Sequence, residues 1–233
     1  MAKKAGLLIT CEHATNHLPG EYCFLFPDLS VLSTHKGYDP GALSAAEAFA
    51  RSLRVPLISS EVTRLLLDLN RSLHNRTLFS VYSRGLTREK RSALLDRYYH
   101  PYRARVLEEM NKIQNEGRPV LHLSVHSFTP VLGGEVRTAD LGLLYDPARE
   151  SEKILCLRWQ SELKILNPLL RIRRNYPYRG RSDGLTAYFR KSFHQKEYQG
   201  VELEINQSLL GDQNHFPEEI KGILIRTLEN LLK

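Results

Sequence analysis

The segment Leu121–Phe128, with the sequence LHLSVHSF, constrains the fold more than any other part of this 233-residue chain. Its apolar residues alternate with histidine and serine, which is the period of two typical of a β-strand with one apolar face. The alternation breaks before Pro130, so His126 lies at the carboxyl end of the predicted strand. Open α/β sheets bind ligands at that edge. We therefore expect His126 to belong to a functional site.

Two other segments repeat this arrangement. The apolar run Leu7–His13 (LLITCEH) ends in an acid and a histidine, and the alternating run Gly200–Gln207 carries Glu202 and Glu204 on one face. The carboxyl ends of such strands meet at one edge of a sheet. Two histidines and a carboxylate gathered there predict a metal-assisted hydrolase.

The composition is that of an ordinary globular protein, with 42% hydrophobic and 25% charged residues. The longest apolar runs are too short to cross a membrane, and the amino terminus lacks the pattern of a signal peptide. Three scattered cysteines (Cys11, Cys23 and Cys156) argue against a disulfide framework. These features predict a cytoplasmic protein with no membrane partner.

The net charge of +7 keeps a nucleic-acid-binding protein open as an alternative. The positive charge is concentrated in residues 84–105 and 171–181. Neither region contains a helix-turn-helix, zinc-finger or RNA-binding signature, so we expect no nucleic-acid partner. Steeply salt-dependent binding to DNA or RNA would support the alternative.

Strand and helix patterns alternate along the chain, which predicts an α/β fold. No linker or repeat divides the sequence, so we expect a single domain over residues 1–233. Residues 63–69 form an apolar run of undetermined type. The predicted strands cover residues 6–12, 55–60, 121–128, 141–145, 170–174 and 200–207, and the predicted helices cover 42–50, 87–115, 150–166, 185–193 and a stretch beginning at Pro217.

Six motifs follow one another along the chain: Cys11–Pro19 (CEHATNHLP), Tyr38–Ala42 (YDPGA), Thr63–Arg71 (TRLLLDLNR), Val125–Phe128 (VHSF), Asn175–Tyr178 (NYPY) and Val201–Gln207 (VELEINQ). Together they resemble the N-formylglutamate amidohydrolase family, in that family's order and across nearly the whole chain. The resemblance implies a three-layer fold similar to that of zinc-dependent exopeptidases, with a mixed, mostly parallel sheet flanked by helices. It also implies hydrolysis of an N-formyl or other N-acyl group from a small anionic amino acid such as N-formylglutamate.

We expect His13, Asp39 and His126 to bind one divalent metal ion, with zinc the predicted metal. Zinc in hydrolases is held by three protein ligands that leave one position open. Asp39 lies in a turn before a helix, where a carboxylate can project from a fixed loop, and Glu12 is the alternative third ligand. The spacing between the histidines matches no local zinc signature, and each residue alone would more commonly be structural.

The resemblance favours Glu204 over Glu202 as the general base that takes a proton from water and transfers it to the leaving amine. Arg64, Asn70 and Arg71 are candidates for binding a substrate carboxylate, because guanidinium groups match its geometry. In the structural alternative, these arginines pair with an acid such as Asp68. Asn175 and Tyr178 complete the predicted substrate-binding set.

Two other hydrolase classes are alternatives. A serine hydrolase is disfavoured because the chain has no Gly-x-Ser-x-Gly motif. A zinc amidase acting on cell-wall peptides is the closer alternative, since residues 35–42 and 63–64 also resemble segments of N-acetylmuramoyl-L-alanine amidases. The lack of an export signal counts against it. The sequence leaves the oligomeric state open.

Overall fold

The computed structural model describes residues 3–233 and contains a six-stranded sheet in the order β2-β1-β3-β8-β6-β7. β2, β1, β3 and β8 are parallel, whereas β6 pairs antiparallel with β8 and parallel with β7. The sheet is therefore mixed and mostly parallel, which confirms the predicted fold class. The strands are β1 (Gly6–Cys11), β2 (Leu57–Ser59), β3 (Val120–Phe128), β6 (Leu141–Leu144), β7 (Ile172–Arg174) and β8 (Tyr198–Asn206).

The helices agree with their predicted positions to within a few residues. The long predicted helix at 87–115 is helical throughout but contains a π-helical turn at Leu95–Tyr99, which separates α2 from α3. The small antiparallel hairpin of β4 (Val131–Leu132) and β5 (Glu135–Val136) was not predicted. The α-helices are α1 (Ala42–Leu53), α2 (Arg88–Leu94), α3 (His100–Asn115), α4 (Glu150–Leu166), α5 (Leu185–Arg190) and α6 (Glu218–Leu231).

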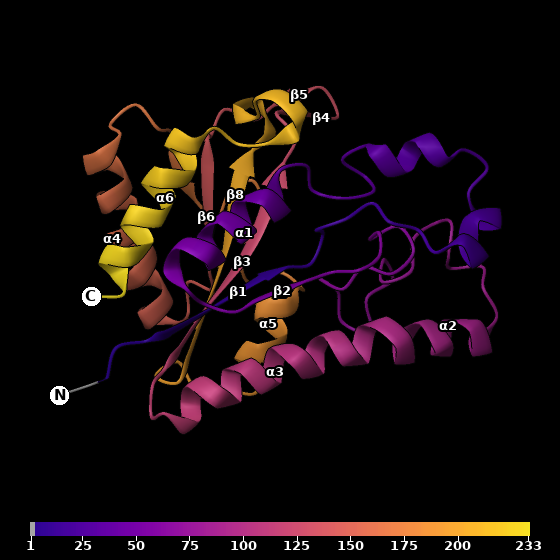
Figure 1. Ribbon diagram of the computed structural model, residues 1–233, viewed down its shortest axis with the longest axis horizontal. Coiled ribbons are helices and arrows are strands. Elements are labelled where there is room, and N and C mark those ends of the chain that lie inside the picture. The colour runs from indigo at the N-terminus through magenta and orange to yellow at the C-terminus, as the bar shows by residue number, and fades with distance from the viewer. Residues whose placement is uncertain (1–2) are drawn as a thin grey trace.

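One face of the sheet is covered by α1, α4 and α6 (Figure 1). Here Leu121, Leu123 and Val125 of β3 pack in one core with Phe49 of α1 and Trp159 of α4. This core is largely apolar, and burial of apolar surface is the main driving force for folding. This face therefore holds the sheet to its helices.

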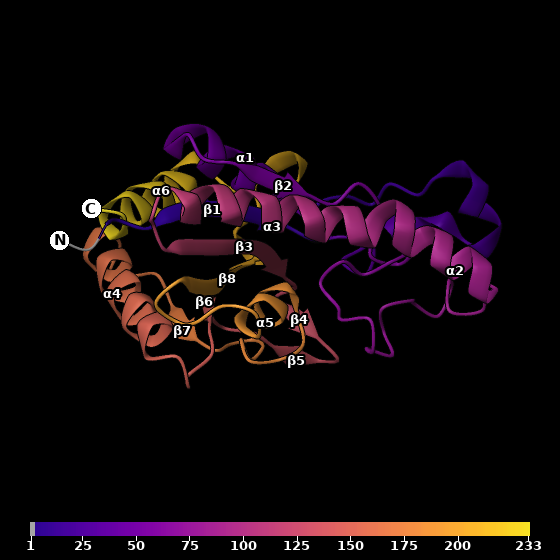
Figure 2. The ribbon, with the colours of Figure 1, turned by 90° about the horizontal axis from the view of Figure 1, so that it is seen from below.

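The opposite face lies against α3 and α5 (Figure 2). β3 presents His122, Ser124 and His126 to this side, so both faces of the strand are buried. Tyr102 of α3 reaches the sheet and donates a hydrogen bond to Glu12, 3.1 Å away. This face combines an apolar core with buried polar groups that continue to the carboxyl ends of the strands.

Beyond those strand ends, long connections extend the molecule away from both termini (Figure 1). The apolar run 63–69 lies in this region and forms turns, with Leu66, Leu67 and Leu69 buried. The cysteines are free, as predicted. Within residues 3–233, no helix is long and apolar enough to cross a membrane.

Candidate active site

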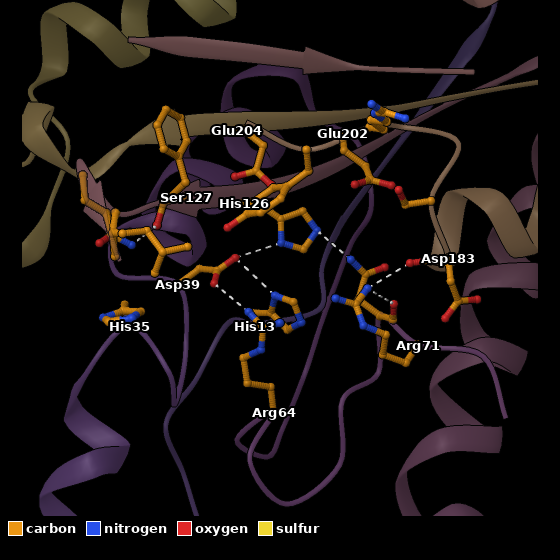
Figure 3. Close-up of a pocket in the computed structure, with 18 residues that line it drawn as sticks. His13, His35, Asp39, Arg64, Arg71, His126, Ser127, Asp183, Glu202 and Glu204 are labelled. Atoms are coloured by element: carbon orange, nitrogen blue, oxygen red, sulfur yellow. Dashed lines mark hydrogen bonds and ion pairs between the residues drawn. The ribbon is translucent and has the colours of Figure 1, made fainter. Parts of the chain in front are cut away.

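A cavity of about 330 Å³ opens at the carboxyl ends of β1, β3 and β8. Figure 3 shows the lining side chains pointing toward one another from these strands and from the surrounding loops. His126 and Glu204 are paired in the register of β3 and β8, which brings the two strand ends together. The lining includes His13, His35, Asp39, Arg64, Asn70, Arg71, His126, Ser127, Tyr178, Arg179, Asp183, Glu202 and Glu204.

The predicted ligands His13, Asp39 and His126 lie together at the bottom of the cavity and are buried. Nδ1 of His13 is 3.2 Å from Oδ2 of Asp39, and Nδ1 of His126 is 2.8 Å from the same oxygen. Ligands bound about 2.0–2.2 Å from one tetrahedral zinc ion are roughly 3.3 Å apart. The donor types and their spacing therefore fit a divalent metal ion.

Backbone contacts hold the Asp39 turn in place. The Asp39 amide donates to the carbonyl of His13 at 3.0 Å, and the Ser127 hydroxyl donates to the carbonyl of Pro40 at 2.7 Å. Gly41 follows with a φ of 81°, and a Cβ there would lie 2.5 Å from a methyl carbon of Leu210. The turn therefore depends on a glycine in order to place Asp39 between the two histidines.

Each imidazole also has a carboxylate on its far side. Nε2 of His13 donates to Asp68 at 2.8 Å, and Nε2 of His126 donates to Glu12 at 3.0 Å. Nδ1 of each ring also lies beside a carboxylate, that of Asp39. If Asp39 binds a metal ion, the carboxylates on Nε2 would hold the ring protons there and leave Nδ1 to bind the same ion. Glu12 thus lies behind His126, and Asp68, which the sequence suggested only as an arginine partner, lies behind His13.

Burial and charge act in opposite directions on these groups. Burial works to raise the pKa values of Asp39 and Asp68, but their neighbours outweigh it, and both values lie well below the usual range. The neighbours are His13 and His126 for Asp39, and His13, Arg64 and Arg71 for Asp68. Burial also opposes ionisation of Glu12, yet hydrogen bonding by His126 lowers its pKa to about 2. The three acids around the imidazoles are therefore ionised at neutral pH.

Glu202 and Glu204 share one face of β8, as predicted, but their surroundings differ. The Thr186 hydroxyl donates to Oε1 of Glu202 at 2.6 Å. Oε2 of Glu204 is buried without a hydrogen-bond partner among the described residues. Burial, assisted by repulsion from Asp39 and Glu202, raises the pKa of Glu204 to about 8. Glu204 is the carboxyl group with an unused oxygen at the cavity.

The two predicted arginines line the cavity and also contact acids, as the structural alternative anticipated. Nη2 of Arg64 is 3.2 Å from Asp68, and its Nη1 is 3.4 Å from Asp39. Nε of Arg71 is 3.8 Å from Asp68, and its Nη1 donates to the carbonyl of Asp183 at 2.9 Å. The charge of each guanidinium is therefore partly balanced by the protein itself.

The other three predicted binding residues have different surroundings. Asn70 lines the cavity and accepts a hydrogen bond from the amide of Leu185 at 2.7 Å. Tyr178 is also part of the lining. Asn175 lies outside it, and its side-chain oxygen accepts from the amides of Tyr145 and Gly180. The structure therefore places Asn175 as a support for the loop that carries Tyr178.

Several cavity or near-cavity residues were missed from the sequence, among them His35, Asp68 and Asp183. His35 lines the rim, although it was expected to be structural. Asp68 orients His13, and Asp183 fixes the 71–75 segment through the backbone amide of Ser72 and the side-chain amide of Asn75. Asp68 lies in the same motif, Thr63–Arg71, as the predicted Arg64, Asn70 and Arg71. Its place in that motif is the sequence feature that could have identified it as a site residue.

The chain is similar to known proteins over most of its length. A model of the N-formylglutamate amidohydrolase family matches residues 5–210. A gene product from Agrobacterium tumefaciens is 29% identical, with a TM-score of 0.84 over 99% of this chain and 91% of that one. An N-formylglutamate amidohydrolase from Ralstonia eutropha shares the fold at 18% identity, with a TM-score of 0.71 over 99% and 95% of the two chains. No curated protein matches this chain. Because the family model spans most of the chain, the protein belongs to the N-formylglutamate amidohydrolase family, a family of hydrolases that act on amide bonds.

Proposed function

We propose that this protein is a metal-dependent amidohydrolase that removes an N-formyl or other N-acyl group from a small anionic amino acid such as N-formylglutamate. The observation that carries the proposal is the arrangement of the two imidazoles. Each has its Nε2 beside a carboxylate and its Nδ1 beside Asp39. Histidines that bind metals commonly have such a carboxylate on the other ring nitrogen.

His13, Asp39 and His126 would hold the ion, with Asp68 and Glu12 fixing the orientation of the rings. A bound zinc ion lowers the pKa of a coordinated water molecule and polarises a substrate carbonyl. Three protein ligands suit this role because they leave a coordination position open. Zinc is the metal we expect from a site with two nitrogen donors and one carboxylate.

Glu204 has the properties needed to move a proton in this cavity. The residue lines the cavity, and its buried Oε2 makes no hydrogen bond within the described part of the chain. As the general base, the carboxylate accepts a proton from the attacking water and delivers it to the leaving amine nitrogen. The positive charge of a metal ion would favour its ionised form.

Arg64 and Arg71 are the groups we assign to the substrate carboxylates. Both line the cavity, and Asn70 between them adds an amide. In the part of the chain that the structure describes, the Arg71 guanidinium has a single ion pair, with Asp68 at 3.8 Å. Its positive charge is therefore only weakly balanced by the protein and can attract a substrate carboxylate. Arg64 is closer to Asp39 and Asp68, so we expect the larger effect on substrate binding from Arg71.

The proposal is tested by metal analysis of protein purified without added zinc, together with hydrolysis assays on a panel of N-formyl and N-acyl amino acids. Wild-type protein should contain about one equivalent of metal and should prefer an acidic amino acid. His13→Ala and His126→Ala should lose the metal while remaining folded by circular dichroism. Full metal occupancy in both variants, or hydrolysis without metal, would overturn the metal assignment.

Replacement of the arginines tests the substrate assignment separately. Losing one charged contact of this kind costs about 2–5 kcal/mol of binding. Arg64→Ala and Arg71→Ala should therefore weaken an N-acylated acidic amino acid far more than a neutral analogue. Equal losses on both substrates would identify these arginines as structural.

A further inference from the structure

Arg103 of α3 is a buried cation without a neutralising acid. Only 6% of the residue is exposed, and its Nε and Nη1 have no hydrogen-bond partner within residues 3–233. None of the ion pairs formed in the described part of the chain includes it, whereas Arg105, on the same helix, pairs with Glu61. Burying a guanidinium costs hydration free energy, and without a carboxylate partner little electrostatic attraction offsets that cost. Stability alone therefore gives a poor account of Arg103.

Two tyrosine rings enclose this guanidinium. Its Cζ lies 4.4 Å from the ring centroid of Tyr99 and 4.4 Å from that of Tyr188. The electron-rich faces of aromatic rings stabilise a cation at such distances without cancelling its charge. Tyr99 belongs to the π-helical turn Leu95–Tyr99, and π-helical turns are frequent at functional sites.

Arg103 also holds the wall of the cavity from behind. Its Nη2 donates to the carbonyl of Arg71 at 2.8 Å and to that of Leu69 at 3.4 Å. The Tyr99 hydroxyl donates to the same Arg71 carbonyl at 3.0 Å. Arg71 in turn lines the cavity and donates to the carbonyl of Asp183. Arg103 and Tyr99 thus fix the main chain on which the Arg71 side chain depends.

Arg103 differs from the other arginines near the cavity in how far its positive charge is balanced. Arg64 lies beside Asp39 and Asp68, and Arg71 also lies near Asp68. Arg179 is exposed, so water screens its charge. Arg103 contributes a buried positive charge that forms no ion pair within residues 3–233, and its Nη2 holds the backbone carbonyl of Arg71.

We propose that Arg103 is a positioning residue that makes this cavity selective for anionic substrates, by fixing Arg71 and by supplying an unneutralised positive charge behind it. The inference rests on the proposed function for its substrate. It assigns to Arg103 no contact with the reacting atoms.

The test compares zinc-loaded wild type, Arg103→Met and Arg103→Lys on N-formylglutamate and on its uncharged diamide. In Arg103→Met, KM for N-formylglutamate should rise about tenfold, whereas KM for the diamide and both kcat values should change by less than about threefold. Arg103→Lys restores the charge and should recover much of the affinity. Equal KM changes on both substrates, or a loss confined to kcat, would overturn the proposal.

Arg105→Met is the matched control, because it removes an exposed arginine two residues further along α3 and should leave both substrates unaffected. If Arg103→Met fails to fold, Tyr188→Leu provides a milder test, since Tyr188 is 41% exposed and contributes one of the two rings. It should raise KM for N-formylglutamate about threefold, in the same selective manner. An unchanged ratio between the two substrates in Tyr188→Leu would count against the proposal.

Calorimetric titration with glutarate separates this inference from the proposed function, because it requires no turnover. Wild-type protein should bind this dicarboxylate even if N-formylglutamate is not its substrate, and Arg103→Met should bind it about tenfold more weakly. Absence of glutarate binding to wild type, or equal affinities of the two proteins, would refute the role of Arg103. Absence of N-formylglutamate hydrolysis alone would refute the proposed function.

Discussion

The two faces of the sheet are buried to a similar extent but differ in chemistry. On β3, Leu121, Leu123 and Val125 face the apolar core under α1, α4 and α6. On the same strand, Ser124 and His126 face α3 and α5, where Glu12 accepts hydrogen bonds from both. Both faces contain an apolar core, but only the second also carries the polar groups of the site.

The difference shows how a protein buries polar groups that a reaction needs. Buried polar groups are costly unless they are hydrogen-bonded. His122 satisfies this condition structurally, since it lies between Thr10 at 2.8 Å and Tyr198 at 2.7 Å. Glu204 does not, because its Oε2 lacks a partner among the described residues. On the polar face, His122 is therefore hydrogen-bonded through both ring nitrogens, whereas Glu204 at the cavity keeps an oxygen without a partner.

The largest effect on stability is expected on the apolar face. Trp159→Ala removes a fully buried ring and the hydrogen bond from its Nε1 to Thr227. We expect a loss of about 3–5 kcal/mol in the free energy of unfolding, measured by urea denaturation. Zinc affinity of the folded variant should be unchanged. A loss of zinc affinity in folded Trp159→Ala would show that the two faces are not independent.

The largest effect on chemistry is expected at Glu204. Glu204→Gln keeps the shape and removes the proton acceptor, so turnover should fall by roughly 10²–10⁴ while zinc and substrate still bind. Steady-state kinetics and metal analysis measure the two effects separately. Glu202→Gln is the control on the same strand face and should cost less, because Glu202 is already bonded to Thr186. A collapse of turnover only in Glu202→Gln would exchange their roles.

An intermediate effect, on zinc affinity, is expected at Asp68, which contacts the Nε2 atom of His13. Asp68→Asn keeps a hydrogen-bond acceptor for His13 but removes the charge that fixes its proton. We expect zinc affinity to fall by about 10–100-fold, measured by competition with a chelating dye. Glu61→Gln, which alters an exposed carboxylate paired with Arg105, is the control and should leave the affinity unchanged. Wild-type affinity in Asp68→Asn would mean that Asp68 serves only Arg64.

The smallest effect is expected on the pH dependence of the stability of the metal-free protein. The pKa of Glu204 is raised from 4.5 to about 8, so the folded protein retains a proton that the unfolded chain has lost between these values. The stability contributed by this proton is present below pH 4.5 and is lost as the pH rises through 8. Glu204→Gln removes this term, so its Tm should fall less than that of wild type between pH 5 and 8. Glu219→Gln, at an exposed position, is the control and should leave the pH dependence of Tm as in wild type. Parallel Tm curves for wild type and Glu204→Gln would contradict the raised pKa.

The strand patterns gave the correct location of several site residues. Because His13, His126 and Glu204 each follow or end an apolar alternation, their arrival at one sheet edge could be predicted from the order of residues alone. The helix at 42–50 and the turn that precedes it likewise placed Asp39. The metal-binding and catalytic roles of these residues, and the single domain over 1–233, remain predictions.

Other features could not be predicted, because they depend on contacts between distant segments. The run 63–69 is as apolar as a strand, yet it forms turns whose leucines pack under the site while Asp68 reaches His13. Asn175 has the polarity of a binding residue but is used to hold Tyr145 and Gly180. In both cases the local pattern is the same for a structural and a functional role.

By itself, the sequence determined the periods of the strands and helices and therefore which residues share a face, because these depend on neighbours a few positions apart. Only the tertiary structure decided that β8 lies between β3 and an antiparallel β6, and that Glu12 and Asp68 lie behind the two imidazoles. Those arrangements join residues 55 to 114 positions apart. They are set by how the whole core packs, which no local pattern of hydrophobic and polar residues encodes.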